Sequence, residues 1–354
     1  MNSNVLNNEN LNTSVMTEAL RETAFAGEPL SAGNDFAKTP AAEPQKVETN
    51  TKKRRLTKSE RTRRREKTVS FIVLFIVCIL FLIPLLYMIG TSFKSDLDLQ
   101  LHPEKLFPSA WSEWTLKHYE GFIVREGKID NMPVWMFNSL WSTLATVLLT
   151  VIVDLVTAYA FVFLKFKIKN GLLRFLILWM AIPGVIGSAP SFAIYSSIRN
   201  SLSIQSDFGT YAYIYMWLVI PGITGIFNLL LMRNFFVSIP KDIIDSAKTD
   251  GASHATIFFK IVVPLAKSTI MLIVLFTFTG SWNSLTWPQL LLSGEKSYWN
   301  TVTVALTGYT GGSAASTMGI QMATSVFALI PIVIIFIITQ NKMIDGLASS
   351  GIKG

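Results

Sequence analysis

Long apolar runs alternate with short polar segments along the chain after residue 68. A membrane-spanning helix needs about 20 mainly apolar residues, because the hydrocarbon core of a bilayer is about 30 Å thick. Six stretches meet this requirement: Val69 to Ser92, Val134 to Leu164, Leu172 to Tyr195, Thr210 to Met232, Ser268 to Leu291 and Met318 to Gln340. Backbone groups in hydrocarbon must bond to one another, so each stretch is expected to be a helix. The pattern therefore predicts an all-α polytopic membrane protein with about six transmembrane helices.

The composition agrees with a membrane protein and narrows its chemistry. Half of the 354 residues are hydrophobic and 15% are charged, whereas a soluble domain has about 25% charged residues. Cys78 is the single cysteine, so no intrachain disulfide can form. The three histidines are not spaced like metal ligands, and no metal site is expected.

The charges between the apolar stretches alternate along the chain. The segment before the first stretch is strongly basic, and the first loop, Lys94 to Pro133, is net acidic. The second loop is basic around Lys165 to Lys169, the fourth carries five lysines or arginines, and the third and fifth are close to neutral. Because cytoplasmic loops carry an excess of Lys and Arg, this alternation predicts cytoplasmic N- and C-termini.

Residues 1–68 form a separate N-terminal extension, and residues 69–354 form the membrane domain. The first 50 residues are rich in Asn, Glu, Thr, Ala and Ser, and they are expected to be disordered because they cannot bury enough apolar surface. A basic run follows from Lys52 to Lys67. It is interpreted as a cytoplasmic topology signal or as a site for anionic lipids. Nucleic-acid binding is not expected, although the net charge is +8.

Asp154 lies near the middle of the second apolar stretch. A carboxyl group there costs roughly 2.5–3.5 kcal/mol on insertion, so it should face protein or water rather than lipid. It either lies on a substrate or ion pathway, pairs with a polar group of another helix, or sits nearer the interface. Prolines also fall inside the stretches, and they predict either ordinary kinks or hinges: Pro84, Pro183, Pro190, Pro221 and Pro331.

The loop at residues 233–264 predicts a short helix outside the membrane. Pro240 suits the first turn of a helix, and Asp250-Gly251 suits its end, because glycine accepts the left-handed cap. Ile243, Ile244 and Ala247 form an apolar edge, and a second helical segment from Ser253 to Val263 re-enters the membrane at Pro264. So short a helix is not stable alone in water, so a partner surface is expected. The alternative is a helix that lies on the lipid surface.

This loop resembles the signature loop of binding-protein-dependent ABC importer permeases. The family pattern is Glu-Ala-Ala, three residues, Gly, nine residues, Ile, one residue and Leu-Pro. The positions correspond here to Asp245, Ser246 and Ala247, to Gly251 between Asp250 and Ala252, and to Ile261, Val263 and Pro264. Asp245, Ser246 and Val263 depart from the pattern but keep its charge, small size and apolar character.

Further segments resemble the carbohydrate branch of this family, the maltose-type inner permeases. They are FNSL at 137–140, AYAF at 158–161, RNFFVSIP at 233–240, WNSLTWP at 282–288 and the C-terminal DGLASSGIKG. The resemblance extends from Val69 to Gly354. The N-terminal extension and an enlarged first loop around Gly121 to Met132 fall outside it, and Asp154 is not part of the family pattern.

The resemblance implies the type I ABC importer permease fold in a bacterial plasma (inner) membrane. It implies a second homologous permease, two ATPase subunits and an extracellular sugar-binding protein as partners. ATP and Mg²⁺ would bind the ATPase subunits, and this chain would hold no cofactor and catalyse no reaction; it contains no Walker A pattern. In the family the loop helix docks in a cleft of the ATPase and couples its closure to the membrane helices. The residues assigned to coupling are Asp245, Ser246, Ala247, Asp250, Gly251, Ala252, Ile261 and Pro264.

Sugar sites use aromatic faces and neutral polar groups, so the candidates for a substrate pathway are Asp154, Asn228, Trp282, Asn283 and Trp287. Anchoring at the membrane interface is the alternative for the tryptophans, and a partner permease could hold most of the site. Three other functions remain: an ABC permease for another solute class, a secondary transporter, and a structural or signalling membrane protein. A secondary transporter should show two related halves, and no clear internal repeat is visible.

Overall fold

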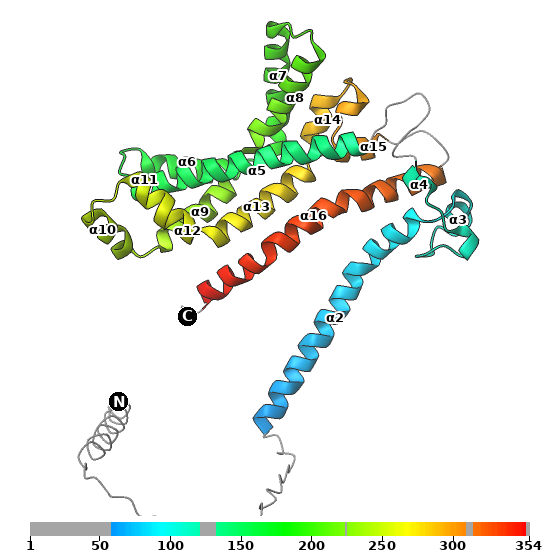
Figure 1. Cartoon of the computed structure of the whole chain (residues 1–354), viewed down its shortest axis with the longest axis horizontal. Coiled ribbons are helices and arrows are strands. Elements are labelled where there is room, and N and C mark those ends of the chain that lie inside the picture. Colours follow the sequence, from blue (N-terminus) through cyan, green and yellow to red (C-terminus); the bar gives the residue numbers. More distant parts are fainter. Residues whose placement is uncertain (1–57, 121–131, 224, 309–313, 352–354) are drawn as a thin grey trace, which may run out of the picture. The chain divides into compact units, whose positions relative to one another are not determined.

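The computed structural model describes residues 58–120, 132–223, 225–308 and 314–351 (Figure 1). Within these ranges every regular element is a helix, and an isolated β-bridge joins Lys94 to Trp114. The chain divides into two units, residues 1–66 and 67–354, and the second unit is described below. Residues 1–57 of the expected disordered extension, and residues 121–131 of the enlarged first loop, lie outside the described residues.

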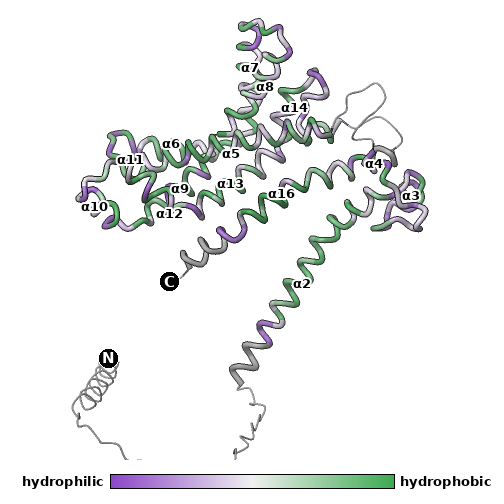
Figure 2. The backbone as a smooth tube through the Cα atoms, in the orientation of Figure 1, coloured by the Kyte–Doolittle hydropathy of each residue, from purple (hydrophilic) through white to green (hydrophobic). Residues whose placement is uncertain are grey.

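Three helices are individually long and apolar enough to cross a membrane. They are α2 (Lys58–Ser92), α5 (Met132–Phe163) and α16 (Ala314–Gly351), and they contain the first, second and sixth predicted spans. Figure 2 shows the apolar character of α2 as an almost continuous hydrophobic stretch. Pro84 and Pro331 lie inside continuous helices, so neither breaks its span.

The third predicted span is not one straight helix. It begins with α6 (Lys169–Trp179). After a break it continues with the 3₁₀ helix η2 (Gly184–Gly187) and α7 (Ser188–Leu202), and the parts before and after the break meet at an angle of 94°. The break falls at Pro183, whose backbone is extended (φ −59°, ψ 125°). Proline cannot donate a backbone hydrogen bond and disfavours helical geometry in the residue before it, which explains the interruption.

The fourth and fifth predicted spans are also interrupted. The fourth comprises α8 (Asp207–Val219), the turn η3 (Ile220–Ile223) around Pro221, and α9 (Ile226–Ser238). In the fifth, α13 (Lys267–Trp282) ends at Asn283 and α14 (Thr286–Leu292) follows. Three pairs of helical segments in the described residues are bent: residues 169–180 with 184–202, 207–223 with 226–238, and 254–265 with 267–282. Counting each of these pairs as one span, the described part of the chain has up to six spans, which agrees with the predicted fold class.

Helix α5 is the inner helix of the membrane unit. It packs against α8, α9, α13 and α15 (Val302–Thr307), and α13 also packs against α16 (Figure 1). Its most apolar window is 44% buried, whereas none of the corresponding window of α2 is buried. Every residue of α2 from Arg65 to Pro84 is exposed, so its apolar surface needs lipid or another subunit around it.

Two apolar clusters lie toward opposite ends of α5. The first joins α5 to the segment between α9 and α13, and its buried members include Leu155, Ala158, Phe236, Ile244 and Ile257. The second is aromatic and joins α7, α8, α14 and η5 (Ser297–Trp299); it includes Tyr195, Tyr213, Tyr215 and Trp299. The same helix therefore connects the loop of residues 233–264 to the opposite end of the bundle.

The loop after α2 is folded around two buried charged residues. Lys94 is fully buried, and its Nζ donates to the carbonyls of His102 (2.9 Å) and Lys105 (2.5 Å), while burial lowers the pKa of its amino group. Asp98 lies in α3 (Asp96–Leu101) and accepts hydrogen bonds from the backbone N–H (3.2 Å) and the hydroxyl of Ser109. Burial acts to raise the pKa of Asp98, but the Ser109 bonds and nearby Lys94 outweigh it and lower that pKa.

Candidate functional site

The short helix predicted for the loop is present as α10 (Lys241–Thr249), between α9 and α11 (His254–Ile257). Ile244 is buried and Ala247 is half-buried, and both pack against the first apolar cluster. Ile243 is 42% exposed, so the predicted apolar edge is packed at two of its three positions. One face of α10 therefore holds the helix on the bundle, and the remainder is free.

The exposed face of α10 carries the first signature residues. Asp245 and Ser246 are exposed, and the Asp245 carboxylate lies 3.5 Å from Nζ of Lys248. The two side chains are 69% and 47% exposed, and an ion pair so open to water contributes little to stability. The Asp245 carboxylate is therefore accessible to a group on another protein.

The end of α10 is a Schellman motif built on Gly251. The Ala252 N–H donates to the carbonyl of Ala247 (2.9 Å), and the Gly251 N–H donates to that of Lys248 (3.0 Å). Gly251 has φ +79°, the left-handed region that favours glycine, and Asp250 precedes it at the C-cap. Ser253 then caps α11 by accepting a hydrogen bond from the Thr256 N–H (3.2 Å). The turn between the two helices is thus defined by local bonds.

The chain returns to the bundle through irregular helix. Ile261 lies in the π-helical segment η4 (Phe258–Val262), and Pro264 lies in the next short helix, α12 (Val263–Leu265). The path then bends by 73° into α13 at the fully buried Ala266. The last signature residues therefore mark the junction between the loop and a membrane helix.

A hydrogen-bonded contact that the sequence analysis missed joins α5 to this loop. The Tyr159 hydroxyl lies 3.0 Å from His254 Nδ1 and donates to the His254 carbonyl at 3.3 Å. The Tyr159 ring also contacts the rings of Phe163 and Phe258. Tyr159 belongs to the AYAF segment. Its hydroxyl near the end of an apolar helix was the sequence feature that could have indicated a polar contact there.

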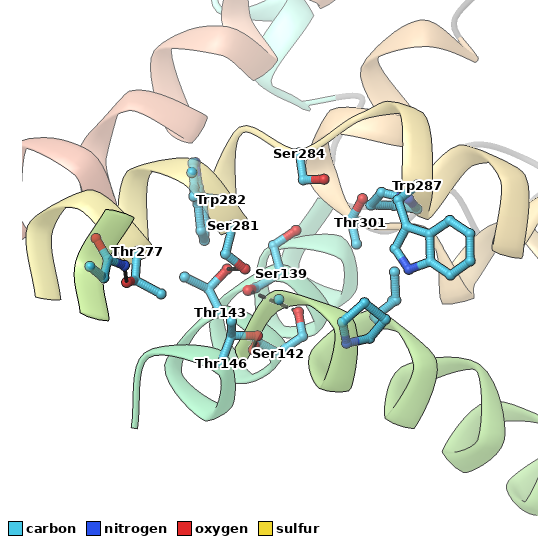
Figure 3. Close-up of a pocket in the computed structure, with 16 residues that line it drawn as sticks. Ser139, Ser142, Thr143, Thr146, Thr277, Ser281, Trp282, Ser284, Trp287 and Thr301 are labelled. Carbon is cyan, nitrogen blue, oxygen red and sulfur yellow. Dashed lines mark hydrogen bonds between the residues drawn. The ribbon is translucent and has the colours of Figure 1, made fainter. Parts of the chain in front are cut away.

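A cavity of about 370 Å³ lies where α5, α9 and α13 meet the turns next to α8, α14 and α15 (Figure 3). Its lining includes eight serines and threonines, two tryptophans and one asparagine. They are Ser139, Ser142, Thr143, Thr146, Thr277, Ser281, Ser284, Thr301, Trp282, Trp287 and Asn228. The sequence analysis missed the hydroxyl groups of α5, although positions 139, 142, 143 and 146 repeat at helical spacing within an apolar stretch.

The structure brings three of the five pathway candidates to this cavity. Asn228, Trp282 and Trp287 line it. Asn283 instead lines a separate cavity of about 230 Å³ with Met88 and the other side of Trp282. The indole N–H of Trp287 donates to the carbonyl of Trp217 (2.8 Å), and that of Trp282 donates to the carbonyl of Ala328 (3.1 Å). Both tryptophans are thus anchored by protein contacts.

Asp154 lies two turns beyond Thr146 on α5 and does not line the cavity. It is 2% exposed, which agrees with the prediction that it avoids lipid, and its Oδ2 has no hydrogen-bond partner among the described residues. Leu155 and Ala158 beside it belong to the first apolar cluster. Among the described residues, no group of three or more His, Cys, Asp or Glu side chains is placed to hold a metal ion.

The fold and these two features define a multi-pass membrane transport component, with a polar cavity between helices and a short helix that has one packed and one exposed face. A family model described as "Binding-protein-dependent transport system inner membrane component" matches residues 155–343. The chain belongs to this family: it is an ABC-importer permease subunit of the inner membrane, a transport component that works with a binding protein and with ATP hydrolysis on a separate subunit.

Characterised relatives match over most of the chain. It is 28% identical over 289 residues to the diacetylchitobiose uptake system permease protein DasC of Streptomyces coelicolor, covering 81% of this chain and 96% of DasC. It is 27% identical over 220 residues to the arabinooligosaccharides transport system permease protein AraQ of Bacillus subtilis (strain 168), covering 62% of this chain and 73% of AraQ.

A solved structure shares the fold. It is a chain of a bacterial ABC transporter involved in the import of the acidic polysaccharide alginate, with a TM-score of 0.63 at 20% identity. The match covers 81% of this chain and 98% of that chain. This chain therefore shares its overall fold with a chain of a solved ABC importer.

Proposed function

We propose that this permease subunit translocates a sugar or oligosaccharide that an extracellular solute-binding protein delivers. The observation that carries the proposal is the cavity lined by hydroxyl groups, one amide and two tryptophans, because neutral polar groups beside aromatic surface suit a polyhydroxy solute. The names of DasC and AraQ, which refer to oligosaccharides, support the same solute class.

The importer would contain this chain, a second homologous permease and two ATPase subunits that bind ATP and Mg²⁺. The unburied apolar surface of α2 supports a further membrane subunit, and the exposed face of α10 supports a soluble one. Both termini and α10 would lie in the cytoplasm, since the loops on that side carry the basic residues.

Coupling would proceed by contact through α10. Asp245 and Ser246 would meet the ATPase surface, and Asp245 would pair with a basic group there. Gly251, between Asp250 and Ala252, would allow close approach at the end of the helix, because an added Cβ would meet no atom of this chain within 4 Å. Ala247, Ile261 and Pro264 would hold the loop on the bundle. Motion of the ATPase subunits would then pass to α13 and α5.

Substrate would pass the cavity residues Asn228, Trp282 and Trp287. Asn283, which follows Trp282, and Asp154, which lies on α5 beyond the cavity residue Thr146, would be neighbouring positions. The test is uptake of labelled oligosaccharides by cells that carry or lack this chain, with and without ATP depletion. We expect uptake that requires both the chain and ATP. Uptake that survives ATP depletion but collapses with the ion gradient would indicate a secondary transporter, and ATP-driven uptake of a non-sugar solute alone would indicate another ABC class.

Cysteine labelling tests on which side of the membrane α10 lies. Cys78 is the single cysteine, so a Cys78→Ser background allows one cysteine to be placed on the exposed face of α10, at Thr249. A membrane-impermeant maleimide should label Thr249→Cys in inside-out vesicles and not in intact cells. Labelling in intact cells would reverse the proposed orientation.

A further inference from the structure

The hydrogen bonds around the cavity of Figure 3 bear on the charge of the solute. Among the described residues, the cavity lining includes no Asp, Glu, Lys, Arg or His. Selectivity therefore has to come from how the neutral groups are arranged. Each hydroxyl can donate one hydrogen bond and accept two, so its remaining capacity depends on which bonds the protein already uses.

Several donors in the wall are already used within the protein. The Ser142 hydroxyl donates to the carbonyl of Asn138 (2.7 Å), and the Thr146 hydroxyl donates to the carbonyl of Ser142 (2.9 Å). Both indole N–H groups are bonded to carbonyls as described above, and the Asn228 amide donates to the Thr277 hydroxyl (3.0 Å). These side chains can still offer oxygen lone pairs or ring surface to a solute. Their donor groups named here are already bonded within the protein.

Thr301 stands out in this wall. It precedes α15, it is 6% exposed, and its Oγ1 has no hydrogen-bond partner among the described residues. A buried hydroxyl without a partner is costly. The Thr301 oxygen is shielded by neighbouring atoms, so its side chain would have to rotate toward the cavity for a solute hydroxyl to remove that cost. Thr301 is thus an independent indication that the wall is built to meet a polar ligand.

We propose that this cavity is a subsite for an uncharged sugar unit and that it selects against anionic sugars such as uronates. The proposal rests on the proposed function and names the substrate class of the same site. Sugar hydroxyls can donate to the acceptor oxygens of Ser142 and Thr146, and Trp282 and Trp287 supply apolar surface for the sugar ring. A carboxylate only accepts hydrogen bonds. Neutral donors such as the Thr301 hydroxyl could meet it, but the described lining holds no cation, so the desolvation of its negative charge would be poorly compensated.

The test uses the whole importer, isolated with its partner subunits through a tag on this chain and reconstituted in liposomes with its binding protein. The probes are labelled neutral disaccharides (maltose, cellobiose and diacetylchitobiose among them) and digalacturonate. The variants are Thr301→Val, which removes the hydroxyl at similar volume, and Thr301→Ser, which keeps it. Thr307→Val is the matched control, because Thr307 is an exposed threonine of α15 that does not line the cavity.

We expect import of a neutral sugar and not of digalacturonate. Thr301→Val should reduce the import rate about three- to tenfold, the range for loss of one hydrogen bond. Thr301→Ser and Thr307→Val should stay within twofold of the parent, with solute affinity of the separate binding protein unchanged in every assay. Normal abundance of each variant in the membrane is verified by immunoblot.

The outcomes separate the two proposals. Digalacturonate import at a rate equal to that of the neutral sugars would overturn this inference and leave sugar import standing. So would a Thr301→Val importer indistinguishable from Thr307→Val. If no saccharide is imported in an ATP-dependent manner, the proposed function itself fails, and the inference fails with it.

Discussion

Two substitutions at Gly251 separate a docking role of this residue from a purely conformational one. Gly251 has φ +79°, and an added Cβ would meet no atom of this chain within 4 Å. A side chain therefore costs backbone strain within this subunit but no steric clash. The substitutions are Gly251→Ala and Gly251→Asn, which differ in strain and both add a side chain to the surface.

The strain can be estimated from the backbone alone. An L-residue in the left-handed region costs roughly 1–2 kcal/mol, which applies to alanine. Asparagine is several-fold enriched in that region, so Gly251→Asn should cost clearly less. Since neither side chain clashes, both variants should fold and insert at normal abundance, and Gly251→Ala should weaken the end of α10 more than Gly251→Asn.

The assay compares solute uptake with substrate-stimulated ATP hydrolysis in the reconstituted importer. If Gly251 lies against the ATPase, both side chains obstruct the contact, and uptake should fall at least tenfold in both variants. The less strained asparagine variant is the decisive one. Wild-type uptake by Gly251→Asn, together with impaired uptake by Gly251→Ala, would show that the glycine serves only to end the helix.

Three other expectations follow from contacts described above. Asp245→Lys should lower uptake severalfold without lowering membrane abundance, because it reverses the exposed charge of α10; normal uptake would contradict a docking role. Tyr159→Phe removes the bonds to His254, worth about 0.5–1.5 kcal/mol each, and should reduce uptake more than ATP hydrolysis; an unchanged ratio of the two rates would contradict coupling through this contact. Asp98→Asn should lower thermal stability at pH 7, measured by tryptophan fluorescence in detergent. The pKa of Asp98 is lowered in the folded state. The stability that its carboxylate contributes is therefore present above the unfolded pKa of about 3.9 and is lost as the pH falls through the folded value. Asp98→Asn should lack this part of the loss of stability in acid, and an unchanged dependence of stability on pH would refute the role given to Asp98.

The apolar pattern was sufficient for the predicted fold class and for the three long spans, but not for the shape of the interrupted ones. The length of an apolar stretch indicates how much of the chain can lie in hydrocarbon. This length was enough to predict the three continuous spans in α2, α5 and α16. The break at Pro183 and the end of α13 at Asn283 depend on local backbone geometry and on packing with neighbours. Proline alone could not identify the breaks, because Pro84 and Pro331 occupy continuous helices.

The loop could be predicted almost in full, whereas the cavity could not. α10 and its glycine end depend on local signals, namely Pro240, the Asp-Gly pair and the amphipathic spacing, and the structure confirms both. The cavity joins α5 to residues such as Thr277 and Thr301, which are more than 100 positions away along the chain. Asn228, Trp282 and Trp287 could be selected from the sequence by residue type. The serines and threonines could not, because only their neighbours in the folded structure show that they line a cavity.

The unbroken course of α5 has a mechanical consequence. From Val134 to Phe163 the helix contains neither proline nor glycine, and it carries Ser142 at the cavity and Tyr159 at the contact with His254. These two residues are 17 positions apart, or about 25 Å along a helix axis. A tilt of only about 5° about one end displaces the other by about 2 Å over that length. A displacement of this size breaks a hydrogen bond. A slight tilt of α5 would therefore be enough to release a solute that is bound to the hydroxyl groups of the cavity.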